Sequence, residues 1–377
     1  MPPPRLGIGW QVAGGYGWGE YGYAILRHLA ESGRAQPVLF EQPLLHDLDP
    51  IDQARLAPIL AAIGEHGAKD FAVLTALGNG GVPAYRTRNS PLSGRPDIGI
   101  AFIEDTRDAA GALARYDQIV AGSTWNRDIM AGWGLKDVPV VVQGVDPDIF
   151  HPAPRRNRFA GRFVVFSGGK IEYRKGQDIV AKAFSVFRQR HPEALLIAVW
   201  GNPHLAGPSF RRLTLSPYID ELPVRDGKLA FGRMFGQLGL SGRDVHVFTR
   251  WPHFRLAGLM RDCDVALFPN RCEGGTNLVA MEAIACGVPT ILSANTGHLD
   301  ILGDGVIALG RQRPVSVPEL GTQGWGESDI EEIVAALEQV WRDREGARRR
   351  ALAAAQAMLA LSWDSQVSRL LDIALAA

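Results

Sequence analysis

The sequence FPNRCEGGTNLVAMEAIACGVPTIL, at residues 268–292, is part of an alternating pattern of strand and helix. The apolar run at 265–268 and the β-branched run at 288–292 have the length and composition of buried strands. Between them, residues 278–286 form an apolar segment long enough for a short helix. A strand, a helix and a second strand in this order indicate parallel strands of one sheet, which is typical of an α/β fold.

Residue types at both ends of the central segment favour a helix there. Thr276 or Asn277 is expected to act as its N-cap, because either side chain can accept a hydrogen bond from the first amide groups. Gly287 stands where a left-handed residue ends many helices, and Pro289 cannot continue one. The start of such a helix is a natural anion site, because its first amide groups lack partners. We therefore expect a phosphate site in this loop.

Two glutamates distinguish this stretch from an ordinary loop and helix. Glu273 lies in the loop beside Gly274 and Gly275, and Glu282 lies inside the otherwise apolar helix. Burial of a carboxylate without a partner is strongly unfavourable. Glu282 must therefore either face solvent at one edge or have a specific partner. The nearby glycines and second glutamate favour a partner, and hence a functional site.

Length and composition indicate a globular protein of two domains. Apolar residues make up 46% of the 377 and charged residues 21%, and 40 basic residues balance 40 acidic ones, so bulk charge predicts no nucleic-acid partner. No run approaches the roughly 18 to 20 apolar residues of a membrane span. Because the first residues lack signal-peptide features, we expect a cytoplasmic protein, with peripheral membrane contact left open. Three cysteines without metal-site spacing are expected to be reduced and structural: Cys263, Cys272 and Cys286.

A glycine-rich turn follows the first expected strand, at residues 6–12, and leads into a helix that reaches about residue 31. Glycines at a strand-to-helix turn let the backbone approach a ligand closely. We therefore expect ligand contacts there. The residues of this turn are Gly14, Gly15, Tyr16 and Gly17.

The same turn leaves a dehydrogenase open as an alternative. Gly17, Gly19 and Gly22 spell GxGxxG, and Glu41 ends the next apolar run, as in dinucleotide-binding turns. Against this, residues 13–16 separate the strand from the first glycine of the motif. A nicotinamide or flavin enzyme is thus the lesser hypothesis.

Further strands are expected at 71–77, 98–103, 118–121 and 138–142, alternating with helices. In a parallel sheet, functional side chains lie at the carboxyl ends of strands. Ser123 there suits the N-cap of a helix at 125–133 as well as a ligand contact. The candidate ligand-contact residues at these ends are Glu104, Ser123, Trp125 and Asn126.

The pattern breaks into turn-forming residues at 143–152 and then restarts, which indicates a domain boundary. Lys170 and Lys175 follow a strand at 161–166 and precede a helix at 178–190, where a diphosphate would need cations.

The next expected strands, 194–200 and 245–248, end at three further candidate binding residues: Gly201, Asn202 and Arg250. Residues 204–232 receive no assignment. Helices are expected at 256–261, 330–361 and 363–375.

Three D-x-D triplets occur, at residues 47–49, 146–148 and 262–264. Paired acids of this kind can hold Mg²⁺ or Mn²⁺ on a nucleotide. None lies in a glycine-rich phosphate loop, and so short a pattern arises readily by chance. We assign no metal and no cofactor.

Residues 273–289 resemble the donor-site signature of the retaining GT-B glycosyltransferases of family four: Glu, a Gly-rich loop, a second Glu, then Ala-x-Ala-Cys-Gly-x-Pro. Three other regions agree in order and spacing, namely the turn at 14–17, the Gly-Val-Asp…Phe-x-Pro segment at 144–152, and the lysines with Gly at 170–176. The last helix, after Ser362, is similar to the family helix that returns to the first domain. The resemblance covers nearly the whole chain.

The resemblance implies an α/β GT-B architecture, with two Rossmann-like doubly wound domains that face each other across a cleft. Residues 1–145 would form the acceptor side and residues 146–361 the nucleotide-sugar side. Residues 362–377 would be the helix that crosses back. Motion at the segment between the domains would close the cleft and exclude water.

The resemblance also implies roles for individual residues. Donor contacts would come from Gly14, Gly15, Tyr16, Gly17, Gly201, Asn202 and Arg250, and acceptor or sugar contacts from Glu104, Ser123, Trp125 and Asn126. Glu273 would bind hydroxyls of the donor sugar, Glu282 the ribose, and Lys175 the phosphate. Lys170 and Lys175 would replace a metal in stabilising the departing diphosphate. The backbone amides expected to face the sugar and phosphate belong to Gly274, Gly275, Thr276, Asn277 and Leu278.

The chain departs from the family pattern at three places. Lys170 stands where the family usually has Arg. The lysine keeps the positive charge but cannot form the two parallel hydrogen bonds of a guanidinium. Eight residues separate Glu273 from Glu282 where the family has seven. The family's first-domain His is absent, and Glu104 is the nearest candidate by position.

By resemblance, the expected function is hexose transfer, with retention and without a metal, from a UDP-, GDP- or ADP-sugar to an unidentified acceptor. The acceptor could be a glycan, a lipid-linked sugar, a small molecule or a protein. A nucleotide-sugar epimerase on the same fold and a non-catalytic sugar-nucleotide sensor remain the alternatives.

Overall fold

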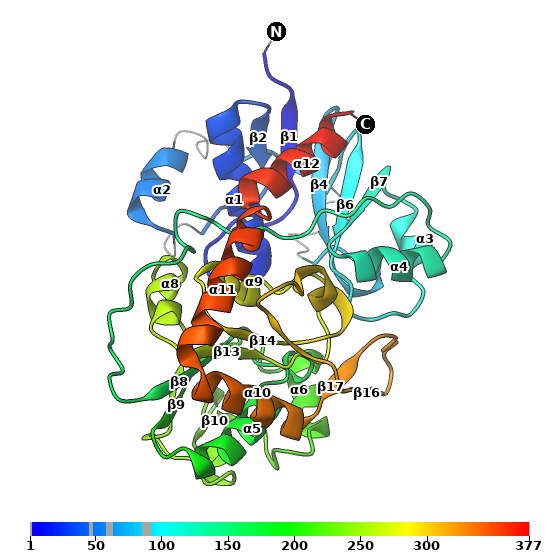
Figure 1. The fold of residues 1–377 in the computed structure, drawn as a ribbon. Helices are drawn as coiled ribbons and strands as arrows, with labels where there is room; N and C mark the ends of the chain where they lie inside the picture. Colours follow the sequence, from blue (N-terminus) through cyan, green and yellow to red (C-terminus); the bar gives the residue numbers. More distant parts are fainter. Residues whose placement is uncertain (1, 45–47, 58–62, 85–91, 377) are drawn as a thin grey trace.

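Two parallel sheets, one in each half of the chain, organise the computed structural model (Figure 1). It describes residues 2–44, 48–57, 63–84 and 92–376. Helices cover the sheets, as parallel strands require, because their crossover connections place helices on both faces. The two halves therefore form the α/β domains that the sequence predicts.

The N-terminal sheet has five parallel strands in the order β2-β1-β4-β6-β7. The strands are β1 (Arg5–Ile8), β2 (Gln36–Leu39), β4 (Ala72–Leu77), β6 (Asp97–Ala101) and β7 (Gln118–Ala121). The helices are α1 (Gly17–Ser32), α2 (Pro50–Leu56), α3 (Ala110–Leu113) and α4 (Thr124–Gly132), with a 3-10 turn η1 (Asn79–Gly81). Two short strands, β3 (Gly67–Ala68) and β5 (Leu92–Ser93), pair separately.

The C-terminal sheet has six parallel strands in the order β12-β9-β8-β13-β14-β15. These are β8 (Phe163–Gly168), β9 (Ala194–Val199), β12 (Val245–Phe248), β13 (Val265–Phe268), β14 (Thr290–Ser293) and β15 (Ile307–Leu309). The main helices are α5 (Gln177–Arg190), α8 (His253–Arg261), α9 (Leu278–Ala285), α10 (Ile330–Arg342) and α11 (Arg344–Leu359). The 3-10 turns η2 (Tyr173–Lys175) and η4 (Thr296–Ile301) and the hairpin of β16 (Gln312–Pro314) and β17 (Gly326–Ser328) complete the domain.

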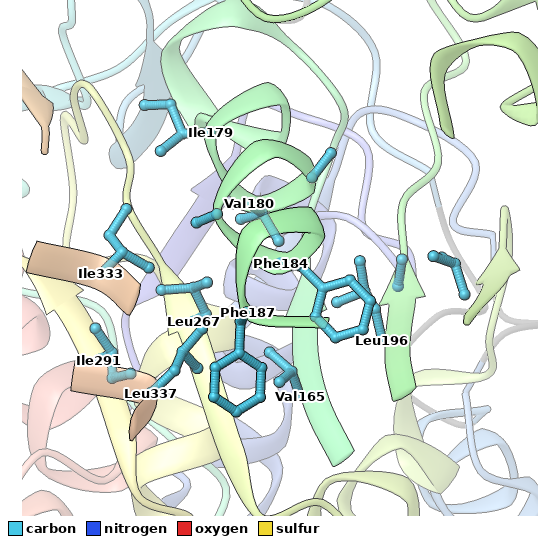
Figure 2. Packing of buried hydrophobic residues seen from close by; sticks show 14 of the residues in the cluster. Val165, Ile179, Val180, Phe184, Phe187, Leu196, Leu267, Ile291, Ile333 and Leu337 are labelled. Atoms are coloured by element: carbon cyan, nitrogen blue, oxygen red, sulfur yellow. The ribbon is translucent and has the colours of Figure 1, made fainter. Parts of the chain in front are cut away.

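Helix α5 packs its apolar face onto this sheet and against α10 (Figure 2). Full burial of one such side chain contributes about 1.5–3 kcal/mol, so this layer is a main source of the domain's stability. The buried residues are Ile179, Val180, Phe184 and Phe187 of α5, Val165, Leu196, Leu267 and Ile291 of the sheet, and Ile333 and Leu337 of α10.

The last helix, α12 (Trp363–Ala376), returns to the N-terminal domain and packs beside α1 (Figure 1). Its residues Val367, Leu370 and Leu371 are buried in that domain's core. The chain thus crosses between the domains twice, and the two crossings are hydrogen-bonded to each other. Val145 N donates to Leu361 O at 2.9 Å, and Trp363 N donates to Val145 O at 2.9 Å.

Replacing Gly144 by alanine is expected to disturb this pairing of the crossings. A Cβ there would lie 2.5 Å from Trp363 N and 2.8 Å from Ser362 C, which are backbone atoms of the second crossing. Overpacking of this kind costs about 1–3 kcal/mol, and we expect that loss in urea unfolding. Gly111→Ala is the control, because a Cβ there meets no atom within 4 Å; an equal loss in both variants would contradict the prediction.

The structure confirms most of the expected elements and shows two errors. Residues 138–142 do not form a strand, since only Val140 forms a single bridge to Ala121 before the chain leaves the sheet. The helix expected at 330–361 is two helices, because Asp343 interrupts the first and caps the second by accepting from Gly346 N at 2.8 Å.

The unassigned residues 204–232 contain several short elements rather than one long loop. They are α6 (Pro208–Arg211), a 3-10 turn η3 (Arg212–Leu215), the hairpin of β10 (Val224–Arg225) and β11 (Lys228–Leu229), and the start of α7 (Gly232–Gly236). In the part of the chain that the structure describes, no helix combines the length and apolar character needed to cross a bilayer.

Candidate functional site

The start of α9 is open because neither expected residue caps it. Asn277 adopts a left-handed φ of 66° and makes no side-chain cap bond. Its Nδ2 instead lies 3.1 Å from Nε2 of His298. Thr276 is also turned away, with Oγ1 3.0 Å from the sulfur of Met281. Asn277 thus occupies the predicted N-cap position, but the expected side-chain cap is absent: among the described residues, neither Asn277 nor Thr276 satisfies the amides that an anion would bind.

His298 holds Asn277 in this position. Burial lowers the pKa of His298 to about 4, so the ring is neutral. Its Nδ1 lies 2.9 Å from Ser293 Oγ and 3.2 Å from Ser293 O, so Nδ1 carries the proton and donates to Ser293. Nε2 is then free to accept from Asn277. His298 was not a candidate from the sequence, since it lies twenty-one residues after Asn277.

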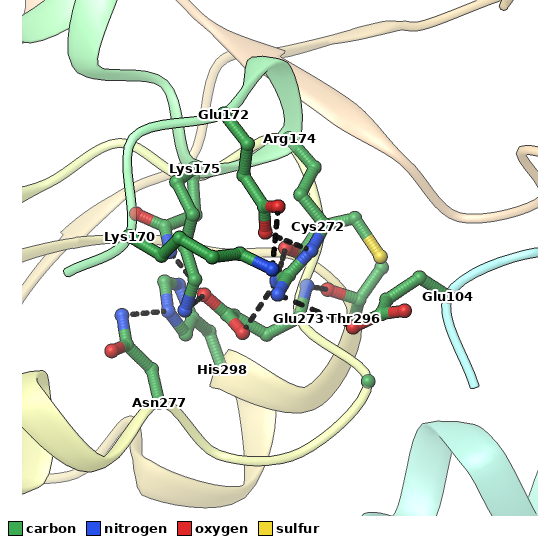
Figure 3. Close-up of polar contacts among 12 residues, drawn as sticks. Glu104, Lys170, Glu172, Arg174, Lys175, Cys272, Glu273, Asn277, Thr296 and His298 are labelled. Carbon is green, nitrogen blue, oxygen red and sulfur yellow. Dashed lines mark hydrogen bonds and ion pairs between the residues drawn. The ribbon is translucent and has the colours of Figure 1, made fainter. Parts of the chain in front are cut away.

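Glu273 lies at the centre of a cluster of charged side chains (Figure 3). Its Oε2 accepts from Arg174 Nη1 at 2.9 Å, and its Oε1 contacts Lys175 Nζ and Asn270 Nδ2. Burial alone would raise the pKa of Glu273, but Lys175 and Arg174 lower it to about 2. The carboxylate is therefore ionised at neutral pH.

Arg174 joins this carboxylate to two others. Its Nε lies 2.8 Å from Glu172 Oε1, and its Nη2 lies 3.3 Å from Glu104 Oε1 of the N-terminal domain. Lys170 reaches the same Glu172, at 3.0 Å. Four candidates from the sequence thus lie in one cluster: Glu104, Lys170, Lys175 and Glu273. The cluster also contains Arg174, which was not a candidate although it directly precedes Lys175.

Glu282 is buried, and its partner is His253 at the start of α8. The Nε2 atom of His253 lies 2.6 Å from Glu282 Oε1, and its Nδ1 lies 3.2 Å from Glu20 Oε1 on α1. The second oxygen of Glu282, Oε2, is buried without a hydrogen-bond partner among the described residues. Neither Glu20 nor His253 was a candidate from the sequence.

The glycine turn of the N-terminal domain lies close to the start of α9. A Cβ on Gly17 would lie 4.0 Å from Leu278 Cδ1. The amide of Gly15 donates to Glu20 Oε1 at 2.7 Å, and the hydroxyl of Tyr16 donates to Gln11 O at 3.0 Å. The turn around Gly14 therefore contributes backbone to the region between the domains.

Ser123 is the N-cap of α4, as predicted, and its hydroxyl also contacts the C-terminal domain. Its Oγ accepts from Asn126 N at 3.1 Å, which caps α4, and it donates to Gly274 O at 2.8 Å, across the domain boundary. The side chain of Asn126 is occupied by the backbone of Ile103, at 2.7 and 2.9 Å. Asn126 is therefore a structural residue of the strand end.

Other predicted residues lie outside the charged cluster. A Cβ on Gly324 would lie 2.7 Å from Trp125 Nε1, so Trp125 packs on the segment before β17. Asn202 Nδ2 donates to Ile171 O at 2.8 Å.

Gly201 closely faces the backbone that precedes Arg250: a Cβ at Gly201 would lie 2.2 Å from Thr249 O. Arg250 itself is exposed after β12. Gly275 has little free space, because a Cβ on it would lie 2.8 Å from Gln143 Oε1.

The D-x-D triplets have structural partners where they are described. Asp146 accepts from Arg27, Asp264 lies 2.9 Å from Arg155, and Asp262 lies 2.6 Å from Arg158. Asp47 lies outside the described residues. Within residues 2–44, 48–57, 63–84 and 92–376, no group of three or more His, Cys, Asp or Glu is placed to hold a metal.

Comparisons with known proteins agree with this arrangement. Residues 244–370 match the family model described as family 4 glycosyltransferase in conflict systems. The D-inositol 3-phosphate glycosyltransferase of Mycobacterium tuberculosis (strain ATCC 25618 / H37Rv) is 30% identical over 243 residues, which are 62% of this chain and 42% of that protein. The chain thus spans less than half of the length of this relative.

Solved structures extend the likeness to both domains. Sucrose-phosphate synthase from Thermosynechococcus elongatus has a TM-score of 0.66 at 15% identity, over 98% of each chain. HepE from Anabaena, in complex with UDP and glucose, has a TM-score of 0.64 at 13% identity, over 99% of this chain and 100% of the other.

Two parallel-sheet domains, with a charged site between them, define the fold of the GT-B glycosyltransferases. Residues 244–370 are similar to the family-four glycosyltransferases, and the fold of the described chain is that of the GT-B enzymes.

Proposed function

We propose that the protein transfers a hexose from a nucleoside diphosphate sugar to a hydroxyl acceptor, with retention at the anomeric carbon. The observation that carries this proposal is the gathering of Lys170, Arg174 and Lys175 around Glu273, beside the uncapped start of α9. Cations and free helix amides stabilise the charge that a departing diphosphate develops. HepE, which shares the fold, was solved with UDP and glucose.

In this proposal Lys170, Arg174 and Lys175 bind the diphosphate, so the reaction needs no metal. Glu273 binds hydroxyls of the donor sugar. Its pairing with Lys175 and Arg174 keeps these cations inside the site before the donor arrives. The leaving diphosphate takes the proton of the acceptor hydroxyl, so no protein nucleophile is required.

The nucleoside end of the donor is assigned to Glu282. Its Oε2 is buried without a hydrogen-bond partner among the described residues, and a ribose hydroxyl would satisfy it. We place the donor on residues 146–361 and the acceptor against residues 1–145, near the glycine turn and Glu104. Helix α12 belongs to the acceptor side, because its apolar residues complete that core. A cytoplasmic location is part of this proposal, since the three cysteines are free and buried.

A thermal-shift screen tests the donor class. We expect one of UDP-, GDP- or ADP-glucose, or the corresponding mannose or galactose donor, to raise the melting temperature. A ligand at about a hundred times its Kd adds roughly 2.7 kcal/mol of stability. NAD and NADP serve as controls, and they should leave the melting temperature unchanged. The absence of a shift with every nucleotide sugar would contradict the proposal.

Turnover assays then separate transfer from its alternatives. Release of nucleoside diphosphate that depends on an added acceptor, with an α-linked product from an α-linked donor, supports retaining transfer. Epimerised sugar formed without an acceptor would instead support an epimerase. Binding without turnover over a broad acceptor panel would support a sensor.

A further inference from the structure

A line of polar contacts crosses between the domains beside the charged cluster. It runs from Gly15 N to Glu20 Oε1 at 2.7 Å, from Glu20 Oε1 to His253 Nδ1 at 3.2 Å, and from His253 Nε2 to Glu282 Oε1 at 2.6 Å. Glu20 belongs to α1 of the N-terminal domain, whereas His253 and Glu282 belong to α8 and α9. His253 thus connects the glycine turn to the carboxylate assigned to the ribose.

The ring of His253 is held between two carboxylates. The side chains of Glu20 and Glu282 are 8% and 4% exposed, so water does little to screen these contacts. Burial alone would lower the pKa of His253, but the two carboxylates raise it well above its usual range. Both ring nitrogens therefore donate, one to each carboxylate. The ring of Phe150 packs on the imidazole at 5.1 Å between centroids and limits its rotation.

The two carboxylate oxygens of Glu282 differ in their hydrogen-bond partners. Oε1 is occupied by His253, and Oε2 is buried with no hydrogen-bond partner among the described residues. Burial raises the pKa of Glu282, and the imidazolium of His253 opposes that rise. Without this cation, the buried carboxylate would more readily take up a proton or turn away from its present orientation.

We propose that His253 is a positioning residue for Glu282: it holds Oε1 so that Oε2 faces the nucleoside and accepts from a ribose hydroxyl. This inference rests on the proposed function, because it requires a nucleoside diphosphate in the site. Through Glu20, the same imidazolium fixes the glycine turn relative to the ribose site. Donor binding and placement of the acceptor-side turn therefore depend on one side chain.

The test compares ribose and dideoxyribose probes. Calorimetry gives the Kd of UDP, GDP and ADP, and of their 2′,3′-dideoxy forms, for the wild-type protein and for His253→Leu. We expect the wild type to prefer the ribose form of the base it binds. In His253→Leu, loss of a charged hydrogen bond should weaken that form roughly tenfold to a hundredfold. The dideoxy form should change little, so the ratio of the two Kd values should fall toward one.

Three further variants keep the outcome interpretable. His253→Gln retains a hydrogen-bond donor and a similar size, so we expect it to restore part of the ribose preference. It also replaces His253→Leu if that variant does not fold. Glu20→Gln should retain the preference, because the contact between His253 and Glu282 remains. His151→Leu is the matched control, since Nδ1 of that ring lies 3.0 Å from the backbone oxygen of Pro147 and no contact with Glu282 is present among the described residues.

An unchanged ratio in His253→Leu and His253→Gln would overturn the inference, while nucleotide binding would leave the proposed function intact. A wild type that binds both forms equally would also overturn it. A wild type that binds none of the six probes would remove the proposed function itself.

Discussion

Lys175→Ala is expected to lower kcat/KM for the sugar donor by about a hundredfold to a thousandfold, the usual effect of removing one group that stabilises charge in a transition state. Lys175 is directed into the site by its contact with Glu273, and its side chain is only 13% exposed. A cation held in such a buried place interacts strongly with a diphosphate, because little water screens it. Initial-rate assays with the donor found in the thermal-shift screen measure the effect.

Further variants distinguish loss of the Lys175 charge from loss of the folded structure. Glu273 keeps Arg174 as a partner when Lys175 is removed, so the variant should retain the wild-type circular dichroism spectrum. Lys175→Met keeps most of the buried length without the charge and should lose as much activity. Lys228→Ala, on an exposed hairpin strand, is the control that should retain it. Wild-type kcat/KM in Lys175→Ala would show that the diphosphate binds elsewhere.

Arg271→Ala is expected to lower the free energy of unfolding by about 3–5 kcal/mol, the cost of leaving one partner of a buried ion pair alone. Arg271 is fully buried and donates to both carboxylate oxygens of Asp178, at 2.9 and 2.6 Å. It also donates to Glu327 at 2.9 Å and stacks on Tyr173, 4.0 Å from the ring centroid. The variant would leave Asp178 buried with its charge uncompensated.

Urea unfolding followed by circular dichroism measures this loss. Arg233→Ala is the matched control, because Arg233 pairs with Glu221 at a similar 2.8 Å but its side chain is 83% exposed. An exposed ion pair contributes only about 0–1 kcal/mol. If both variants unfolded at the same urea concentration, burial would not be what makes the Arg271 pair important.

Three strands have the bounds that the sequence predicts, at 118–121, 245–248 and 265–268. The run at 265–268 is apolar throughout, because a central parallel strand covered on both faces needs no alternation. The run at 138–142 is equally apolar, but it lies at the sheet edge where the chain turns toward the crossing, and it pairs at one residue only. Composition alone does not distinguish these two situations.

The site was predicted where its residues are close in sequence and missed where they are not. Glu273 and Glu282 stood out because both occur within one short segment with glycines. Their partners come from elsewhere: Arg174 is 99 residues from Glu273, and His253 reaches Glu20 on the other domain. An isolated His or Arg gives no sign of such contacts in a single sequence. The capping prediction for Asn277 failed for the same reason, since His298 offers its side chain another acceptor.

The pairing of the two chain crossings limits how the domains can move. Because both covalent connections run side by side at Val145 and Ser362, we expect relative motion of the domains to be largely a rotation about one axis through that place. The pocket that Glu20, His253 and Trp363 line lies beside this axis. Displacement in a rotation grows with the radius, so the contact between Glu20 and His253 should change least as the domains separate. A donor could then arrive and leave without loss of the alignment that His253 maintains.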